Sequence, residues 1–553
     1  MLQVKSLEIS FKNAPSVVSN ISFDLNKNEI VGIVGESGSG KSITSLAILG
    51  LLPKFANIKG EVLFDGKNLL TYTDKDFQKI RGSKIAMIFQ EPMSSLNPTL
   101  SCGVQVAEIL QQHTNLSSEE IKNEVINLFE KVKLPRPKAI YSSYPHQISG
   151  GQKQRVMIAM AIACKPLLLI ADEPTTALDV TVQKEIILLL KELQQEYKIG
   201  IIFISHDLAL VSEIANTVVV MHKGNIVEQG KTSEVFLHPK KNYTKALINS
   251  KPKNEKRFKI LPTVNDFINN TVNNTLYSDE ERTAFHQKIY GKTPLLEIKN
   301  LNKNFISNAS WFTKPTIVKA VNEVSFKIYE GETLGLVGES GCGKTTLSRT
   351  ILRLEKATSG QIIYNGTDIT KLSKSAFKKL RKEIQIIFQD PFSSLNPRIT
   401  VGNAILEPMK VHNILNSTKE RKEYVYNLLE KVGLDKEHFH RYPHEFSGGQ
   451  RQRIGIARTI ALQPKLIICD ESVSALDVSV QAQVLNLLNQ LKSEFNFTYI
   501  FISHDLSVVK YMADQLVVMN KGKIEEIADA DEIYTNPKTN YTKTLIAAIP
   551  KGL

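Results

Sequence analysis

Two copies of one ordered set of motifs run through this sequence, and the duplication limits its fold more than any other feature. Gly35-Glu-Ser-Gly-Ser-Gly-Lys-Ser42 recurs as Gly338-Glu-Ser-Gly-Cys-Gly-Lys-Thr345, and a Gln-Glu/Asp-Pro-x-Ser-Ser-Leu-Asn-Pro run occupies 90–98 and again 389–397. Shorter motifs follow in the same order. Motifs that repeat in a fixed order indicate a duplicated structural unit. We therefore predict two domains of one type in tandem.

The chain is too long for one compact core, and its composition is that of a folded protein. Of its 553 residues, 42% are hydrophobic and 23% are charged. We place the two domains at 1–250 and 294–553. The linker between them, 251–293, is basic at its start and then rich in asparagine, with one short helix predicted near 279–289. The first domain also has a longer loop than the second, at 53–58.

The sequence predicts neither a membrane span nor a secretion signal. Its N-terminus alternates apolar and polar residues like a half-buried strand and has no apolar signal-peptide core. The apolar stretch from Val156 to Ala171 is interrupted at Pro166, and it is shorter than the roughly 20 residues that span a bilayer. We interpret it as a helix followed by a buried strand. The protein is expected to be soluble and cytoplasmic, or peripheral to a membrane.

The net charge is compatible with several kinds of partner, and the cysteine pattern argues against metal-binding and disulfide sites. The net charge of +13 fits nucleic acid, an anionic membrane, or simply a lysine-rich solvated surface. No Cys-x-x-Cys pair occurs, so neither a zinc or iron–sulfur site nor a disulfide framework is predicted. We expect Cys164 and Cys469, at least, to be buried as small apolar residues. The cysteines are Cys102, Cys164, Cys342 and Cys469.

Each glycine-rich repeat has the context of a phosphate-binding loop, because an apolar strand precedes it and an apolar helix follows. Glycines let backbone N–H groups turn toward phosphate at a helix N-terminus, whose dipole favours an anion. The lysine contacts the β- and γ-phosphates, and the following hydroxyl binds Mg²⁺. The predicted ATP-binding residues are Gly35, Glu36, Ser37, Gly38, Ser39, Gly40, Lys41 and Ser42 in the first copy. In the second copy they are Gly338, Glu339, Ser340, Gly341, Cys342, Gly343, Lys344 and Thr345.

A buried strand in each copy ends in two acids, which are costly to bury without a metal or a reaction to compensate. In the first copy, Asp172 suits the Mg²⁺ shell, and Glu173 suits polarising the attacking water. His206 follows a strand that ends Ile-Phe-Ile-Ser, and we predict that it contacts the γ-phosphate. A lone histidine would usually be structural, but the repeated context favours catalysis. The corresponding residues of the second copy are Asp470, Glu471 and His504.

A second glycine-rich turn opens a helix shortly before each acidic strand. It comprises Ser149, Gly150, Gly151 and Gln152 in the first copy and Ser447, Gly448, Gly449 and Gln450 in the second. This arrangement resembles the ATP-binding cassette of ABC proteins, whose signature sequence it nearly matches. Ile148 and Phe446 stand where leucine is usual. The resemblance covers both halves and implies an α/β fold: two P-loop NTPase (RecA-like) cassettes, each with an antiparallel β subdomain and a helical subdomain.

In that family two cassettes face head to tail, and each ATP lies between one phosphate loop and the signature of the other cassette. The resemblance therefore implies an intramolecular cassette pair with two composite sites. The first phosphate loop would join Ser447 and Gly449, and the second would join Ser149 and Gly151. Neither site has lost its glutamate or histidine, so both are expected to hydrolyse ATP with Mg²⁺.

Other family residues can be carried over position by position. Gln90 and Gln389 match the glutamine that touches Mg²⁺ and senses the membrane partner, so with Ser42, Asp172, Thr345 and Asp470 they complete the predicted metal ligands. Phe11 and Phe305 stand where an aromatic ring stacks on adenine, although tyrosine is commoner there. Ala177-Leu-Asp179 and Ala475-Leu-Asp477 match the D-loop, and Ser472 replaces a usual proline.

Two motifs look like those of the oligopeptide, dipeptide and nickel importer subfamily: the Ser-Ser-Leu-Asn-Pro run, and Asn-Tyr-Thr-Lys at 242–245 and 540–543. The fused form resembles the ATPase subunits of glutathione and small-peptide importers. It implies two membrane permease subunits, an extracytoplasmic solute-binding protein, and a peripheral location on the cytoplasmic face of the cell (inner) membrane. Many relatives carry a cysteine cluster after the Tyr-Thr motif. This chain has none there, so no iron–sulfur cluster is expected.

The main alternative is a soluble twin-cassette ATPase that acts on ribosomes or nucleic acid. Such factors join their cassettes by a long, charged helical linker, whereas 251–293 is short and poorly periodic. The sequence therefore favours the importer, with no direct contact to nucleic acid. It leaves the cargo open among peptides, glutathione, nickel chelates and peptide antibiotics, because the solute-binding protein selects the ligand.

Overall fold

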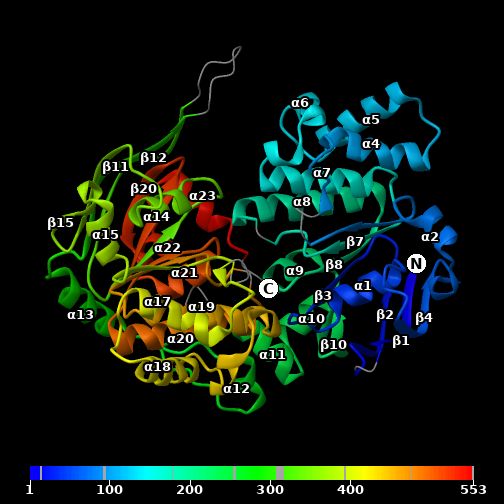
Figure 1. Ribbon diagram of the computed structural model, residues 1–553. Coiled ribbons are helices and arrows are strands. Elements are labelled where there is room, and N and C mark those ends of the chain that lie inside the picture. The colour runs from blue at the N-terminus through cyan, green and yellow to red at the C-terminus, as the bar shows by residue number, and fades with distance from the viewer. Residues whose placement is uncertain are drawn as a thin grey trace. The chain divides into compact units, whose positions relative to one another are not determined.

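The computed structural model describes residues 1–12, 15–90, 95–176, 178–252, 257–306, 317–390, 394–474 and 476–550 (Figure 1). The chain divides into two compact units. The first consists mainly of Met1–Asn249, and the second mainly of Ser250–Asp266 together with Thr271–Ile549. Each unit holds one copy of the repeated motifs and is described below by itself.

The first unit contains two sheets. A four-stranded antiparallel sheet has the order β2-β1-β4-β5, and a six-stranded sheet has the order β10-β9-β3-β8-β7-β6. All strands of the larger sheet run parallel except β10, which pairs antiparallel with β9. The smaller sheet consists of β1 (Leu2–Phe11), β2 (Val18–Leu25), β4 (Ala56–Phe64) and β5 (Lys67–Asn68). The larger consists of β3 (Ile30–Val34), β6 (Ile85–Ile88), β7 (Leu168–Asp172), β8 (Gly200–Ile204), β9 (Thr217–His222) and β10 (Asn225–Lys231).

Helices of the first unit fall into two groups. Helices α4 to α7 pack on one another as a helical subdomain, and the others accompany the sheets (Figure 1). The subdomain contains α4 (Cys102–His113), α5 (Ser118–Lys131), α6 (Pro137–Ser142), the 3-10 turn η2 (Pro145–Gln147) and α7 (Gly150–Ile162). The others are α1 (Lys41–Ile48), η1 (Leu69–Thr71), α2 (Asp74–Ile80), α8 (Val180–Tyr197), α9 (Leu208–Ile214), α10 (Thr232–Leu237) and α11 (Asn242–Asn249).

The second unit repeats both sheets, with orders β12-β11-β14-β15 and β16-β17-β18-β13-β19-β20. Its antiparallel sheet consists of β11 (Leu296–Ile306), β12 (Ile317–Ile328), β14 (Ser359–Tyr364) and β15 (Thr367–Asp368). Its larger sheet consists of β13 (Thr333–Val337), β16 (Ile384–Ile387), β17 (Leu466–Asp470), β18 (Thr498–Ile502), β19 (Gln515–Asn520) and β20 (Lys523–Asp529). The predicted fold class is therefore confirmed for both copies.

Helices of the second unit follow the same plan. The subdomain contains α17 (Val401–Val411), α18 (Thr418–Lys431), η4 (Lys436–His440), η5 (Pro443–Glu445) and α19 (Gly448–Ile460). The others are α14 (Lys344–Ile351), η3 (Ile369–Lys371), α15 (Lys374–Leu380), α20 (Val478–Phe495), α21 (Leu506–Met512), α22 (Ala530–Thr535) and α23 (Asn540–Ala547). Between the cassettes lie α12 (Val264–Ile268) and α13 (Asp279–Tyr290). The short helix predicted near 279–289 is thus present.

Local signals in the sequence explain several boundaries. Capping boxes at Ser117 and Ser417 start α5 and α18, where the Ser–Glu spacing predicted them. The stretch from Val156 to Ala171 forms the end of α7 and then β7, as interpreted. Cys469 is fully buried as expected, whereas Cys164 is only half-buried. Among the described residues, no helix combines the length and apolarity that a bilayer crossing needs.

One local expectation was wrong. Residues 53–58 were expected to form a loop, but 56–58 belong to β4. Phe11 pairs with Ala56 and Ile9 with Ile58 along the antiparallel β1–β4 ladder. The extra residues lengthen the strand because they continue its antiparallel pairing with β1, which provides hydrogen-bond partners for their backbone groups.

The segment between the cassettes packs on the second unit through polar contacts. The half-buried Arg257 donates to the backbone carbonyls of Lys510 and Ala513, at the C-terminal end of α21. On α13, the Arg282 guanidinium forms ion pairs with Asp529 and Asp531. Carbonyls at a helix C-terminus lack intrahelical donors, so Arg257 satisfies groups that the helix itself cannot.

We therefore predict that Arg257→Met destabilises the second unit by about 1–3 kcal/mol, because it leaves partly buried carbonyls without a donor. The urea midpoint of that unit, followed by circular dichroism, measures this loss. Lys259→Met in the same segment is the matched control. It removes an exposed ion pair to Glu281, which is worth about 0–1 kcal/mol. Equal effects of the two substitutions would contradict the capping role.

Candidate active site

The phosphate loop of the first cassette joins β3 to α1 and encloses the ammonium of Lys41. That side chain is only 6% exposed. Its Nζ donates to the carbonyls of Gly35 and Glu36, both at 2.8 Å, and lies 3.4 Å from Ser39 Oγ. Gly35 has φ 151°, and a Cβ there would lie 2.1 Å from the Met221 carbonyl oxygen. Only glycine fits that position.

The second phosphate loop, between β13 and α14, has the same geometry. Lys344 is also 6% exposed, and its Nζ donates to the Gly338 carbonyl at 2.7 Å and the Glu339 carbonyl at 3.0 Å. Cys342 replaces Ser39, with Sγ 3.8 Å from the lysine Nζ. Both loops therefore hold a buried cation at a helix N-terminus, the arrangement that binds an anionic phosphate.

A hydroxyl and a carboxylate meet beside each loop. Ser42 Oγ donates to Asp172 Oδ1 at 3.2 Å, and Thr345 Oγ1 lies 3.5 Å from Asp470 Oδ1. Burial raises the pKa of both aspartates, and the neighbouring glutamate adds to the rise. A bound cation would offset that cost. Hard oxygen donors of this kind fit Mg²⁺, which keeps several of its own waters.

Glu173 directly follows β7, and its carboxylate is surrounded by donors. Gln90 Nε2 donates to Oε2 at 3.1 Å, Thr176 Oγ1 donates to it at 2.8 Å, and His206 Nδ1 lies 3.2 Å away. Burial opposes ionisation, but the hydrogen bond and charge of His206, together with Thr176, outweigh it and lower the pKa of Glu173 to about 2. An ionised carboxylate is the form that can polarise or accept a proton from water.

Glu471 has a similar environment in the second cassette. Gln389 Nε2 donates to its Oε2 at 2.8 Å, and His504 Nδ1 lies 3.5 Å from the same oxygen. Burial again opposes ionisation, but His504 outweighs it and lowers the pKa. Glu173 and Glu471 also share a left-handed backbone, with φ of 47° and 48°. Non-glycine residues pay about 1–3 kcal/mol for this conformation, and such strain concentrates at functional positions.

Each signature motif forms the exposed start of a helix. Ser149 caps α7, with Gln152 N–H donating to its Oγ at 3.3 Å and Gln152 Oε1 accepting from the Ser149 N–H at 3.0 Å. Ser447 and Gln450 cap α19 with the same two bonds and the same distances. Both serines are exposed. An exposed helix N-terminus can bind an anion presented from outside its own cassette.

The structure brings together most of the predicted residues within each cassette, namely the loop lysine, the hydroxyl, both acids, the glutamine and the histidine. Phe11 packs against Phe55, with ring centroids 6.0 Å apart, and Phe305 is 42% exposed. Their stacking on adenine remains a prediction. The D-loop alanines at 177 and 475, and motif residues 91–94 and 391–393, lie outside the described residues.

Sequence reasoning missed one contributor, Thr176. Its hydroxyl bonds the Glu173 carboxylate, whereas Ser474, at the corresponding place in the second cassette, donates to the Glu471 backbone carbonyl at 2.8 Å. The signal was available, since a hydroxyl residue lies three positions after each glutamate. Its target, carboxylate or carbonyl, depends on the turn and could not be read from the sequence.

Comparison with known proteins identifies the family. Residues 18–176 and 321–474 both match the model of the ABC transporter family. This chain belongs to the ABC transporter family, as an ATPase coupled to transport. Residues 227–270 and 526–552 match a second model, the C-terminal region of oligopeptide/dipeptide transporters.

Curated relatives align along the whole chain. Glutathione import ATP-binding protein GsiA of Salmonella paratyphi A is 45% identical over 567 residues, covering 100% of this chain and 89% of the relative. The GsiA protein of Escherichia coli O6:H1 is 44% identical over 569 residues with the same coverage. Among solved structures, the ADP- and Pi-bound dimer of the ATP-binding cassette MJ0796 aligns with 42% of this chain and 98% of its own, at 26% identity and TM-score 0.39.

We predict that Glu173→Gln and Glu471→Gln each remove about half of the ATP turnover and that the double variant loses about 10²-fold or more. Glutamine keeps the shape of the side chain but removes the charge that polarises water. Steady-state phosphate release measures the effect. Glu196→Gln, at an exposed ion pair with Lys131, is the control and should leave turnover unchanged. Full activity of either single variant would exclude that glutamate from catalysis.

Proposed function

We propose that the chain is the energy-coupling subunit of a peptide-type importer and works at the cytoplasmic face of the cell membrane. The observation that carries this proposal is the match to the oligopeptide/dipeptide C-terminal region in both cassettes. Full-length relatives that are named for glutathione import support it. Peptides and glutathione are the cargo that these similarities favour. The comparisons give no support to a ribosome-associated factor.

We further propose that the chain hydrolyses two ATP molecules, each with Mg²⁺, at composite sites. The first would use Lys41, Ser42, Asp172, Glu173 and His206 with the signature of the second cassette. The second would use the equivalent residues Lys344, Thr345, Asp470, Glu471 and His504 with the signature of the first. Support comes from the exposed signature serines and from the completeness of both sets of residues.

Double variants test whether each ATP site combines residues of both cassettes. Arginine at an exposed signature serine would block the nucleotide that this signature covers. Glu173→Gln with Ser447→Arg should then affect one site twice and leave about half of the turnover, like either single variant. Glu173→Gln with Ser149→Arg should affect both sites and reduce turnover about 10²-fold or more. The reverse ranking would show that each ATP stays within one cassette.

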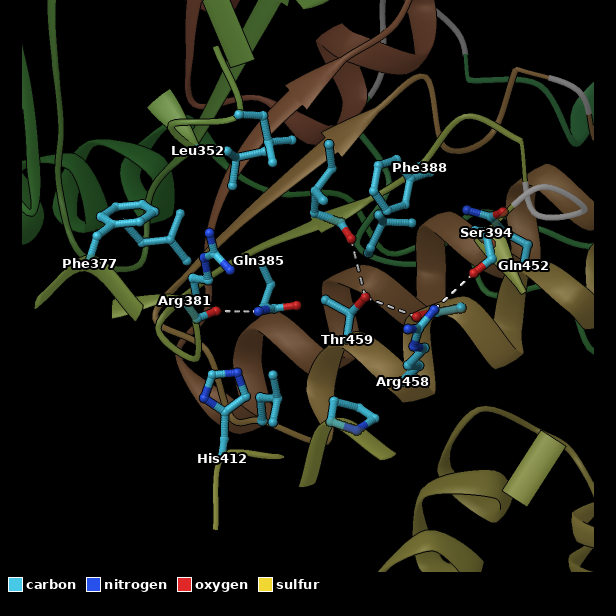
Figure 2. Close-up of a pocket in the computed structure, with 17 residues that line it drawn as sticks. Leu352, Phe377, Arg381, Gln385, Phe388, Ser394, His412, Gln452, Arg458 and Thr459 are labelled. Carbon is cyan, nitrogen blue, oxygen red and sulfur yellow. Dashed lines mark hydrogen bonds between the residues drawn. The ribbon is translucent and has the colours of Figure 1, made fainter. Parts of the chain in front are cut away.

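A cavity in each cassette offers a docking place for a permease. The cavity of the second cassette has a volume of about 360 Å³ and lies between the β16 edge and helices α17 and α19. Figure 2 shows Arg381, Gln385 and His412 at one end of it and Gln452 and Ser394 at the other. It includes Phe388, the residue before Gln389, which bonds Glu471. A partner bound in the cavity could therefore shift Phe388 and, with it, the adjacent Gln389 that bonds the Glu471 carboxylate.

The corresponding cavity of the first cassette has a volume of about 240 Å³ and a different lining. Three methionines line it, and it includes Phe89, which precedes Gln90. Flexible methionine surfaces adapt to apolar partners. Each cavity also has an arginine, Arg81 in the first and Arg381 in the second, and only the second adds Gln385 and His412 to a mainly apolar lining. The methionines are Met87, Met157 and Met160. Two different linings suit two different permease subunits, with the solute-binding protein on the outer side.

An uptake experiment tests the proposed function. Cells that lack the chain should lose uptake of labelled tripeptides or glutathione. The wild-type chain should restore it, and Glu173→Gln/Glu471→Gln should not. Leu51→Glu with Leu354→Glu, at exposed positions on the two cavities, should abolish uptake and membrane retention while ATP turnover persists. The control is Leu237→Glu, which is 54% exposed and lines neither cavity. Unaltered uptake without the chain, or its sedimentation with ribosomes, would contradict the proposal.

A further inference from the structure

A tyrosine near the end of each cassette is hydrogen-bonded to the phosphate loop. The backbone N–H of Glu36 donates to Tyr243 Oη at 3.2 Å, and that of Glu339 donates to Tyr541 Oη at 3.1 Å. These tyrosines belong to the Asn-Tyr-Thr-Lys motif, which the catalytic assignment leaves unexplained. The same contact occurs in two copies whose surroundings differ, so it is not a feature of one local environment.

The peptide group that the tyrosine bonds also holds the lysine. In the first cassette, the Gly35–Glu36 peptide donates its N–H to Tyr243 and accepts from Lys41 Nζ through the Gly35 carbonyl at 2.8 Å. In the second cassette, the Gly338–Glu339 peptide does the same, with 2.7 Å between Lys344 Nζ and the Gly338 carbonyl. A peptide bonded on both sides is polarised, and its orientation is fixed.

Burial, a ring contact and hydrogen bonds of the preceding turn fix the position of Tyr243. Tyr243 is 5% exposed, and its ring centroid lies 4.0 Å from that of His222. It stands at the start of α11, and the preceding turn is held by Glu228 on β10. The Glu228 carboxylate accepts from the backbone N–H groups of Lys240 and Lys241 at 2.9 and 3.2 Å. The tyrosine is thereby fixed to the edge of the large sheet.

An equivalent carboxylate holds the turn before Tyr541 in the second cassette. Glu526 on β20 accepts from the backbone N–H groups of Lys538 and Thr539, at 3.1 to 3.3 Å, just before α23 begins. Asn520 stands where the first cassette has His222. The ring contact thus differs between the copies, while the hydroxyl bond and its carboxylate anchor are the same in both.

We propose that Tyr243 and Tyr541 are positioning residues that preorganise the phosphate loops for ATP. Each hydroxyl fixes the peptide that holds the loop lysine, so the lysine and the loop amides lie in place before nucleotide arrives. This proposal rests on the assignment of the phosphate loops as ATP sites. Its consequence is that the C-terminal region of each cassette contributes to ATP affinity through one hydroxyl group.

The test is the variant Tyr243→Phe/Tyr541→Phe, which keeps both rings and removes only the hydroxyls. Loss of one neutral hydrogen bond in each site should raise KM for ATP about 2- to 12-fold. Turnover at saturating ATP should stay within about twofold, because the tyrosine touches no reacting atom. Affinity for a fluorescent ATP analogue should fall by the same factor as KM rises.

A matched control separates positioning from a structural role. Tyr290→Phe removes a hydroxyl that bonds Glu332 at 3.2 Å, outside both phosphate loops, and should leave KM unchanged. If Tyr243→Phe/Tyr541→Phe lowers the melting temperature without nucleotide but keeps wild-type KM and affinity, the tyrosines only support packing and the proposal is overturned.

Lysine variants distinguish this inference from the assignment on which it rests. Lys41→Ala/Lys344→Ala should abolish binding of the fluorescent analogue. If binding survives, the ATP-site assignment itself fails. If binding is lost in the lysine variant and unaltered in the phenylalanine variant, only the role of the tyrosines fails.

Discussion

The buried ammonium of the phosphate-loop lysine is the interaction around which each cassette is arranged. A buried charge costs several kcal/mol unless polar partners surround it, and Lys41 and Lys344 obtain theirs from loop carbonyls. The loop that provides these carbonyls also passes close to β9 or β19, where only a glycine with positive φ fits. Burial raises the pKa of Asp172 and Asp470, at the ends of β7 and β17, and the lysine of each phosphate loop partly opposes that rise.

Most of the fold, and the side chains that the structure brings together beside each phosphate loop, could be predicted because their signals are local. Capping boxes, a glycine-rich loop after an apolar strand, and two acids at a strand end each specify their own neighbourhood. Contacts between distant segments could not be predicted. Nothing in the linker sequence shows that Arg257 completes the end of α21, or that the tyrosine hydroxyls reach the phosphate loops. Such polar contacts leave no periodicity, and periodicity is what sequence reasoning detects.

The two copies agree around the candidate catalytic glutamate and differ farther from it. Both keep the glutamate, its strained backbone and its glutamine and histidine partners. In contrast, Thr176 bonds the carboxylate while Ser474 bonds a carbonyl. One cavity is rich in methionine, while the other has none and includes Gln385 and His412. Divergence of this kind is expected when two cassettes share one reaction but contact different neighbours.

The contacts of the linker with the second unit determine where the chain could be divided into two cassettes. Arg282 is matched by Asp529 and Asp531, and at the corresponding positions of the first cassette stand Lys231 and Ser233. Asp531 also pairs with Lys510 on α21, whereas the ion-pair partners of Asp529, Arg282 and His286, both lie on α13. The segment between the cassettes is therefore a structural part of the second unit, and cutting the chain just before residue 294 would remove both ion-pair partners of Asp529.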